Sequence, residues 1–196
     1  MSNLPNILTS IRILLVPILV VALLTRFDGR EFVGLGLFLL AALTDFLDGY
    51  FARRFNLVSR FGQLLDPAAD KILMAAAFVS LVELDARVTP SWMVVAILAR
   101  EFAVSALRSH AAAEQIVIPA GLSGKIKTGA QIVAVSLLII YNQLGEFSHL
   151  APISLWVALI VTLYSGCEYF ARYRRLLNGS ASGLSRPSPP YPPASV

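Results

Sequence analysis

Six apolar stretches, separated by short charged or polar segments, dominate this chain of 196 residues. They run over residues 13–24, 33–47, 72–84, 90–107, 126–141 and 151–170. Leu and Ala are their commonest residues and no period-two alternation is present, so each is predicted as a helix, and a membrane barrel is rejected. Several are shorter than the roughly 20 residues of a spanning helix, but buried or snorkelling polar residues at their ends extend them. We therefore expect an all-α integral membrane protein with six transmembrane helices.

The composition also favours a membrane protein over a soluble one. Apolar residues make up 57% of the chain and charged residues 14%, whereas about 25% of a soluble domain is charged. The single cysteine, Cys167, excludes an internal disulfide framework. We expect the membrane domain to occupy residues 1–177. Residues 178–196 are rich in Ser, Pro and Gly and are expected to form a disordered tail.

The distribution of basic residues predicts the orientation in the membrane. Six spans place both termini on one side. Thirteen of the sixteen Lys and Arg residues then fall on that side, if Arg100 is counted with the end of its helix that is nearer the basic side. Because the more basic side faces the cytoplasm, we expect a multi-pass protein of the cytoplasmic (inner) membrane with both termini inside.

Four carboxylates stand where lipid should disfavour them. Asp45 and Asp48 lie three residues apart at the end of the second predicted helix, and Asp66 and Asp70 lie four apart at the start of the third. Both spacings place the two side chains on one helical face. The connecting loop is short, so the two pairs are expected to converge at the cytoplasmic boundary.

Converging carboxylates repel one another and lose hydration, so they need protons or cations. An all-oxygen set with no His or Cys suits Mg²⁺ or Mn²⁺. Two divalent cations would balance four carboxylates, and a bridged pair stabilises displacement at phosphorus. The alternative is a set of helix-end acids paired with the nearby Arg and Lys residues.

The residues between the acids favour a phosphate ligand. At 100° per residue, Gly49 lies about 40° from Asp45, and Ala52 lies about 20° from it on the other side. Gly62 and Asp66 have the same relationship as Asp45 and Gly49. These small residues leave a bare strip where a ligand can approach the backbone. Arg53 follows at the helix end, within reach of a phosphate.

The pattern D-x-x-D-G-x-x-A-R followed by G-x-x-x-D-x-x-x-D resembles the signature of the CDP-alcohol phosphatidyltransferases. All eight positions match: Asp45, Asp48, Gly49, Ala52, Arg53, Gly62, Asp66 and Asp70. The strings LPNILTSIRI, RFGQLLDPAADK, REFAVSALR and SGKIKT look like the bacterial phosphatidylglycerophosphate synthase branch. The resemblance implies a six-helix bundle, usually a homodimer, with a cytoplasm-facing active site.

The resemblance also implies a reaction and residue roles. The phosphatidyl group of CDP-diacylglycerol passes to sn-glycerol 3-phosphate at the bilayer surface, and CMP is released; no nucleic acid partner is expected. Asp70 is the family's proposed general base and can also contact one metal ion. The other roles are metal binding by Asp45, Asp48 and Asp66, and CDP-diacylglycerol binding by Gly49, Ala52, Arg53, Ser59 and Gly62.

Four basic residues are candidates for the acceptor's phosphate: Arg100, Arg108, Lys125 and Lys127. Arg100 is favoured over Arg108 because a deep arginine without a partner is expensive in a membrane. The alternative for Arg100 is an ion pair with Glu101 or with an acid on another helix. The alternative for the two lysines is contact with anionic lipid.

Two rival functions remain open. The same scaffold could use another acceptor, such as inositol phosphate, serine or phosphatidylglycerol, because the acceptor pocket is built from remote basic residues. Alternatively, membrane carboxylates could line the pathway of an ion or proton transporter. The Gly and Ala strip with Arg53 and Arg54 favours a bound phosphate ester over a transport pathway.

Overall fold

The computed structural model describes the backbone of residues 4–55, 60–114 and 121–183, and the side chains of residues 10–44, 68–114 and 121–176. Within these ranges the chain is helical and has no strand, which confirms the all-α prediction. The α-helices are α1 (Leu4–Leu24), α2 (Arg30–Phe55), α3 (Arg60–Leu84), α4 (Ser91–Ala113), α5 (Leu122–Ile139) and α6 (Leu150–Gly183). Two short 3-10 helices, η1 (Tyr141–Gln143) and η2 (Gly145–Phe147), connect α5 to α6.

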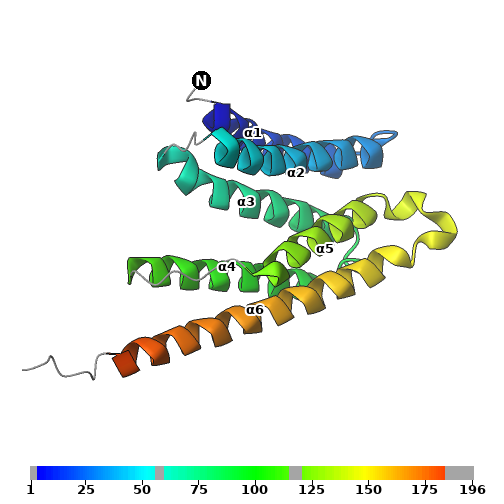
Figure 1. Cartoon of the computed structure of the whole chain (residues 1–196). Coiled ribbons are helices and arrows are strands. Elements are labelled where there is room, and N and C mark those ends of the chain that lie inside the picture. The colour runs from blue at the N-terminus through cyan, green and yellow to red at the C-terminus, as the bar shows by residue number, and fades with distance from the viewer. Residues whose placement is uncertain (1–3, 56–59, 115–120, 184–196) are drawn as a thin grey trace, which may run out of the picture.

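The helices form a bundle in which consecutive elements reverse direction (Figure 1). Helix α1 packs against α2 and α3, whereas α6 packs against α4 and α5. The end of α2, the start of α3 and the end of α6 lie on the side where α1 begins, which we call the N-terminal end of the bundle (Figure 1). The segment that contains the four aspartates therefore lies at the same end of the bundle as the start of α1 and the end of α6.

A continuous apolar core joins the helices. Its fully buried side chains include Leu19, Phe38, Phe78, Ile97 and Leu155. A second, smaller cluster of Val104, Ala111 and Tyr169 lies between α4 and α6. These apolar contacts hold the two halves of the bundle together and set the positions of the polar side chains between α4, α5 and α6.

Glycine at position 34 allows α1 and α2 to approach closely. A Cβ atom at Gly34 would overlap the side chain of Leu23, which is itself buried in the core. A larger residue would therefore force α1 and α2 apart.

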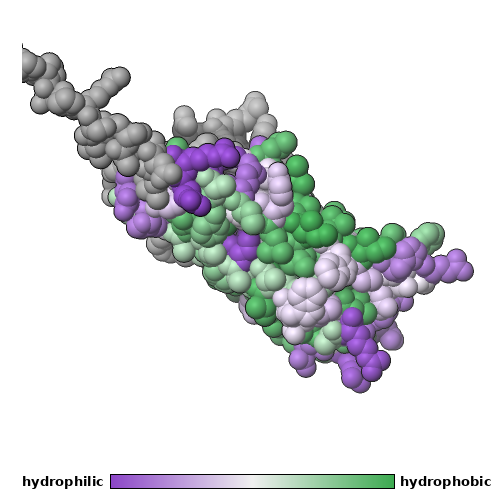
Figure 2. Space-filling view, turned by 90° about the horizontal axis from the view of Figure 1, so that it is seen from below, coloured by the Kyte–Doolittle hydropathy of each residue, from purple (hydrophilic) through white to green (hydrophobic). Residues whose placement is uncertain are grey.

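The outer surface is apolar over much of the bundle. Large apolar side chains are exposed on all six α-helices, for example Leu14, Leu40, Val79, Val95 and Ile160. Figure 2 shows a hydrophobic band across the middle of one face, with hydrophilic residues mostly toward its two ends. By length and composition, two described segments, Leu122–Ile139 and Gly145–Leu176, could cross a membrane. The crossing of all six helices stays a prediction.

Helix α6 continues to Gly183, beyond residue 177, where the predicted membrane domain ends. Ser and Gly have weak helix propensity, but extending a formed helix avoids the cost of nucleating a new one. The part of the predicted tail from residue 184 lies outside the described residues.

Candidate functional site

The four aspartates lie on two consecutive helices, as predicted, but inside the helix ends, because α2 continues to Phe55 and α3 begins at Arg60. Asp45 and Asp48 belong to the last part of α2, and Asp66 and Asp70 to the first part of α3. Of these side chains, the structure describes that of Asp70, which is half-buried. The remaining motif side chains lie outside the described set: Asp45, Asp48, Gly49, Ala52, Arg53, Ser59, Gly62 and Asp66. Convergence of the four carboxylates therefore stays a prediction.

A pocket of about 660 Å³ brings Asp70 together with all four predicted phosphate-binding residues. Its walls come from α3, α4, α5, α6 and Gly121, just before α5. The lining residues are Asp70, Lys71, Arg100, Glu101, Val104, Ser105, Arg108, Gly121, Gly124, Lys125, Lys127, Thr128, Gly129 and Tyr169. Five of these side chains are cationic and two are carboxylates, so the pocket, which we call the basic pocket, suits an anionic ligand.

The start of α5 adds to this positive potential. Gly121 and Gly124, at the first turn of α5, line the basic pocket. The N–H of Gly121 donates to the hydroxyl of Tyr169, and that of Gly124 donates to the carbonyl of Gly121. The aligned peptide dipoles nevertheless give the start of a helix a partial positive charge. Together with the neighbouring Lys125 they favour a phosphate at this position.

Glu101 holds two of the four predicted cations. Its Oε1 accepts a hydrogen bond from Nη1 of Arg100 at 3.1 Å, and its Oε2 accepts one from Nζ of Lys127 at 2.6 Å. The side chains of Arg100, Glu101 and Lys127 are 8%, 13% and 10% exposed. The ion pair between Arg100 and Glu101, the alternative predicted for Arg100, is therefore confirmed.

Polar side chains from α5 and α6 extend this cluster into the bundle. Gln131 donates to Oε1 of Glu101 at 3.3 Å and to Oγ1 of Thr162 at 3.1 Å. Arg100 donates through Nη2 to Oγ of Ser165 at 2.7 Å. We call these six residues the polar network: Arg100, Glu101, Lys127, Gln131, Thr162 and Ser165. Such mutual satisfaction is what makes buried charges tolerable in an apolar bundle.

Tyr169 links the polar network to the start of α5. The guanidinium carbons of Arg100 and Arg172 each lie 5.9 Å from the centroid of its ring. Its hydroxyl accepts a hydrogen bond from the backbone N–H of Gly121 at 3.4 Å. Cation–π contacts of this kind strengthen when they are shielded from water, and Tyr169 is buried.

Helix α6 contributes polar side chains to the site that were not predicted from the sequence. Thr162, Ser165 and Tyr169 are spaced by three and four residues, so they share one helical face within an otherwise apolar stretch. This polar stripe was a usable signal, because polar residues inside an apolar helix usually face protein rather than lipid. The missing information was which helix the stripe faces.

Arg108 and Lys125 differ from the two buried cations. Both line the basic pocket and both are exposed. Within the part of the chain that the structure describes, neither side chain forms an ion pair or a hydrogen bond. The basic pocket thus contains two buried cations with fixed partners and two exposed cations that are free to meet a ligand.

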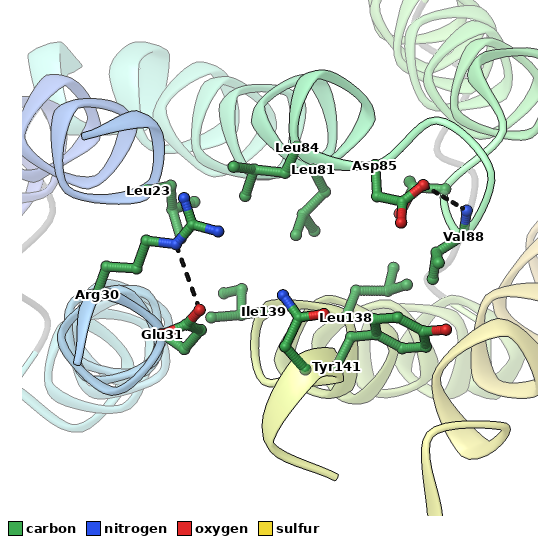
Figure 3. A pocket seen from close by; sticks show the side chains of 12 residues that line it. Leu23, Arg30, Glu31, Leu81, Leu84, Asp85, Val88, Leu138, Ile139 and Tyr141 are labelled. Carbon is green, nitrogen blue, oxygen red and sulfur yellow. Dashed lines mark hydrogen bonds and ion pairs between the residues drawn. The ribbon is translucent and has the colours of Figure 1, made fainter. Parts of the chain in front are cut away.

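A second pocket lies between the far ends of α3 and α5 and the start of α2 (Figure 3). It is small, about 80 Å³, and half of its lining residues are leucine, valine or isoleucine. Arg30 pairs with Glu31 at its edge, and Asp85 accepts a hydrogen bond from the N–H of Val88 (Figure 3). Asp85 also accepts one from the N–H of Arg87. These polar groups stabilise the helix ends, and the pocket has no comparable group of free cations.

The described side chains contain no group of three or more His, Cys, Asp or Glu residues that could hold a metal ion. The side chains of Asp45, Asp48 and Asp66 lie outside the described set. A metal site at the acid-rich helix ends therefore rests on the motif and on the position of Asp70 beside the basic pocket.

Comparison with known proteins identifies the family. The family model described as CDP-alcohol phosphatidyltransferase matches residues 2–164. This range includes the acidic motif, the basic pocket except Tyr169, and the polar network except Ser165. This chain belongs to the CDP-alcohol phosphatidyltransferase family. The match leaves the transporter alternative without support.

Individual family members are similar along most of their length. A Bacillus subtilis protein named CDP-diacylglycerol–glycerol-3-phosphate 3-phosphatidyltransferase is 46% identical over 88% of this chain and 95% of its own. A Haemophilus influenzae protein of the same name is 37% identical over 85% of this chain and 91% of its own. A Mycobacterium tuberculosis protein named probable phosphatidylglycerophosphate synthase is 35% identical over 91% and 85%.

Proposed function

We propose that this CDP-alcohol phosphatidyltransferase transfers the phosphatidyl group of CDP-diacylglycerol to sn-glycerol 3-phosphate and releases CMP. The product would be phosphatidylglycerophosphate, a precursor in phospholipid biosynthesis. The observation that carries the proposal is the basic pocket, in which Asp70 and four cations from other helices line one space. The names of the similar proteins support the same acceptor.

The acceptor's phosphate would bind among Arg100, Arg108, Lys125 and Lys127. Phosphate groups form strong charge-assisted hydrogen bonds with Arg and Lys, and the start of α5 adds free N–H groups. A phosphorylated acceptor therefore fits this space better than serine, which has no phosphate.

Asp70 would serve as the general base. It lies on α3 at the wall of the basic pocket, next to the acid-rich helix ends. In the proposed reaction an acceptor hydroxyl loses its proton to Asp70, and the hydroxyl oxygen attacks the phosphorus that carries the diacylglycerol. The bond from that phosphorus to the bridging oxygen breaks, and CMP leaves with the bond's electron pair. Asp70 must lie within about 3 Å of the hydroxyl for this proton transfer.

The acidic motif would hold two divalent cations, Mg²⁺ or Mn²⁺, through Asp45, Asp48, Asp66 and Asp70. The donor set fits such ions because it consists of carboxylate oxygens alone. When bound, these cations would neutralise the pyrophosphate and stabilise the negative charge that develops on CMP. Gly49, Ala52, Arg53, Ser59 and Gly62 would bind the cytidine diphosphate group.

The proposed substrates require a site at a membrane surface, because the donor's acyl chains stay in lipid while the acceptor is soluble. We propose that all six helices cross the inner membrane, with both termini and the site facing the cytoplasm, and that the protein forms a homodimer. The apolar outer band (Figure 2) supports the membrane placement. Labelling of single cysteines introduced at the two ends, in a Cys167→Ala background, with a membrane-impermeant maleimide tests the orientation. Chemical cross-linking in membranes tests the dimer.

An acceptor assay tests the reaction. Purified protein is incubated with CDP-diacylglycerol, Mg²⁺ and one candidate alcohol at a time, and CMP release is measured. The candidates are sn-glycerol 3-phosphate, inositol phosphate, serine and phosphatidylglycerol. We expect CMP release with sn-glycerol 3-phosphate. The proposal would be overturned if inositol phosphate were the one candidate that supports CMP release, or if none of the four candidates did.

A further inference from the structure

The carboxylate of Glu101 accepts hydrogen bonds from three side chains at the buried bottom of the basic pocket, which we call its floor. Nη1 of Arg100 and Nε2 of Gln131 donate to Oε1, and Nζ of Lys127 donates to Oε2. Both carboxylate oxygens therefore have partners, from α4 itself and from α5. The carboxylate joins two cations that lie 27 residues apart in the chain.

Lys127 depends on this carboxylate for its position. Its side chain is 10% exposed, and Glu101 is the one described acid that pairs with it. A lysine side chain is a flexible four-carbon stem with a compact charge, so without a partner it would turn toward water. Arg100 depends on it less, because Nη2 is also held by Ser165.

Arg108 and Lys125 occupy the exposed part of the same pocket and have no partner among the described residues. They are free to bind an incoming phosphate directly. The buried pair at the floor, by contrast, has fixed positions before any ligand arrives. This division separates ligand binding from ligand positioning within one pocket.

We infer that Glu101 is a positioning residue for the phosphorylated acceptor: it holds Lys127, and with it Arg100, at the floor of the basic pocket. The phosphate then binds between these fixed cations and the exposed Arg108 and Lys125. The inference rests on the proposed function, since it concerns the acceptor of that reaction. A negatively charged side chain would thus help to bind a negatively charged ligand, although the two charges repel each other.

Two readings of Glu101 predict opposite signs. If Glu101 only lowers the positive charge of the pocket, removing its charge strengthens the attraction for a phosphate and lowers the acceptor KM. If Glu101 positions Lys127, removing its charge releases a buried cation and weakens phosphate binding. Preorganised donors bind a ligand more tightly because their side chains lose less conformational entropy when the ligand binds.

The experiment measures kcat and both KM values for Glu101→Gln and Glu101→Asp in the detergent-solubilised full-length protein. Glutamine keeps the size and removes the charge, whereas aspartate keeps the charge and moves it by about one methylene. We expect each variant to raise the acceptor KM by about tenfold, the effect of losing one charge-assisted hydrogen bond. We also expect the inhibition constant of inorganic phosphate to rise, with the KM for CDP-diacylglycerol unchanged.

Glu114→Gln is the matched control. Glu114 immediately follows α4, is about half exposed, pairs with His110 and does not line the basic pocket. We expect wild-type kinetics for this variant.

A lower or unchanged acceptor KM in Glu101→Gln would overturn the inference, as would a wild-type acceptor KM in Glu101→Asp. If Glu101→Gln does not fold, Glu101→Asp is sufficient. Aspartate keeps the negative charge, so a pure charge effect predicts an unchanged acceptor KM, whereas a positioning role predicts a higher one. Failure of the proposed function is a separate outcome: the wild-type protein would then release no CMP with sn-glycerol 3-phosphate.

Discussion

Gly166 on α6 leaves the space that the side chain of Arg100 fills. A Cβ atom at position 166 would lie 2.9 Å from Cγ of Arg100 and 3.3 Å from its Nε. This close approach lets the guanidinium group of Arg100 reach Ser165 on the same helix. Among the described residues Nε of Arg100 has no hydrogen-bond partner. The packing of a glycine thus decides where a buried cation of the basic pocket lies.

Alanine at position 166 is therefore expected to displace Arg100. Gly166→Ala should raise the acceptor KM by several-fold and leave the KM for CDP-diacylglycerol unchanged, because the added methyl group moves Arg100 and not the acidic motif. Steady-state kinetics with each substrate varied in turn gives both values. Gly36→Ala is the control, since a Cβ at Gly36 meets nothing within 4 Å. A wild-type acceptor KM in Gly166→Ala would contradict the expected role of this contact.

Tyr169 is expected to act through its ring more than through its hydroxyl. The ring contacts the guanidinium groups of both Arg100 and Arg172, whereas the hydroxyl makes one long hydrogen bond with the N–H of Gly121. Tyr169→Phe should keep the acceptor KM within about fivefold of wild type, because a long neutral hydrogen bond contributes about 0.5–1 kcal/mol. Tyr169→Leu should raise it by about tenfold, through the loss of two cation–π contacts. Equal effects of the two variants would show that the hydroxyl dominates.

The exposed cations are expected to bind the acceptor directly. Arg108→Gln and Lys125→Gln should each raise the acceptor KM by about tenfold, since each removes one charged hydrogen bond to phosphate. Because these side chains are exposed, thermal stability should change little. Arg87→Gln, an exposed arginine at the opposite end of the bundle, serves as the control. An unchanged acceptor KM in both pocket variants would place the phosphate elsewhere.

The acidic motif is expected to be essential for turnover. Asp45→Asn and Asp66→Asn should each abolish CMP release while the protein still inserts in membranes, because each removes a charged ligand of the proposed cations. Chelation with EDTA should have the same effect on the wild-type protein, and Mg²⁺ or Mn²⁺ should restore it. Asp28→Asn, in the exposed turn between α1 and α2, is the control. Substantial turnover in both motif variants would contradict the metal assignment.

Much of this molecule was accessible to sequence reasoning because the relevant signals are local. Apolar stretches predicted the helices, and spacings of three and four residues placed Asp45 with Asp48 and Asp66 with Asp70 on two adjoining helix ends. Arg100 was also recognised as a deep charge that needs a partner. The choice between a phosphate and Glu101 as that partner could not be made, since it depends on the packing of α4 against α5 and α6.

By itself, the sequence determined the all-α architecture, the acidic motif and the family, because helix periodicity and motif spacing depend on residues close together in the chain. Only the tertiary structure decided that Lys127 meets Glu101, that Ser165 and Gly166 accommodate Arg100, and that Tyr169 joins the start of α5. These contacts depend on the rotation of each helix about its axis. That rotation is set by the packing of the whole apolar core and not by any one segment.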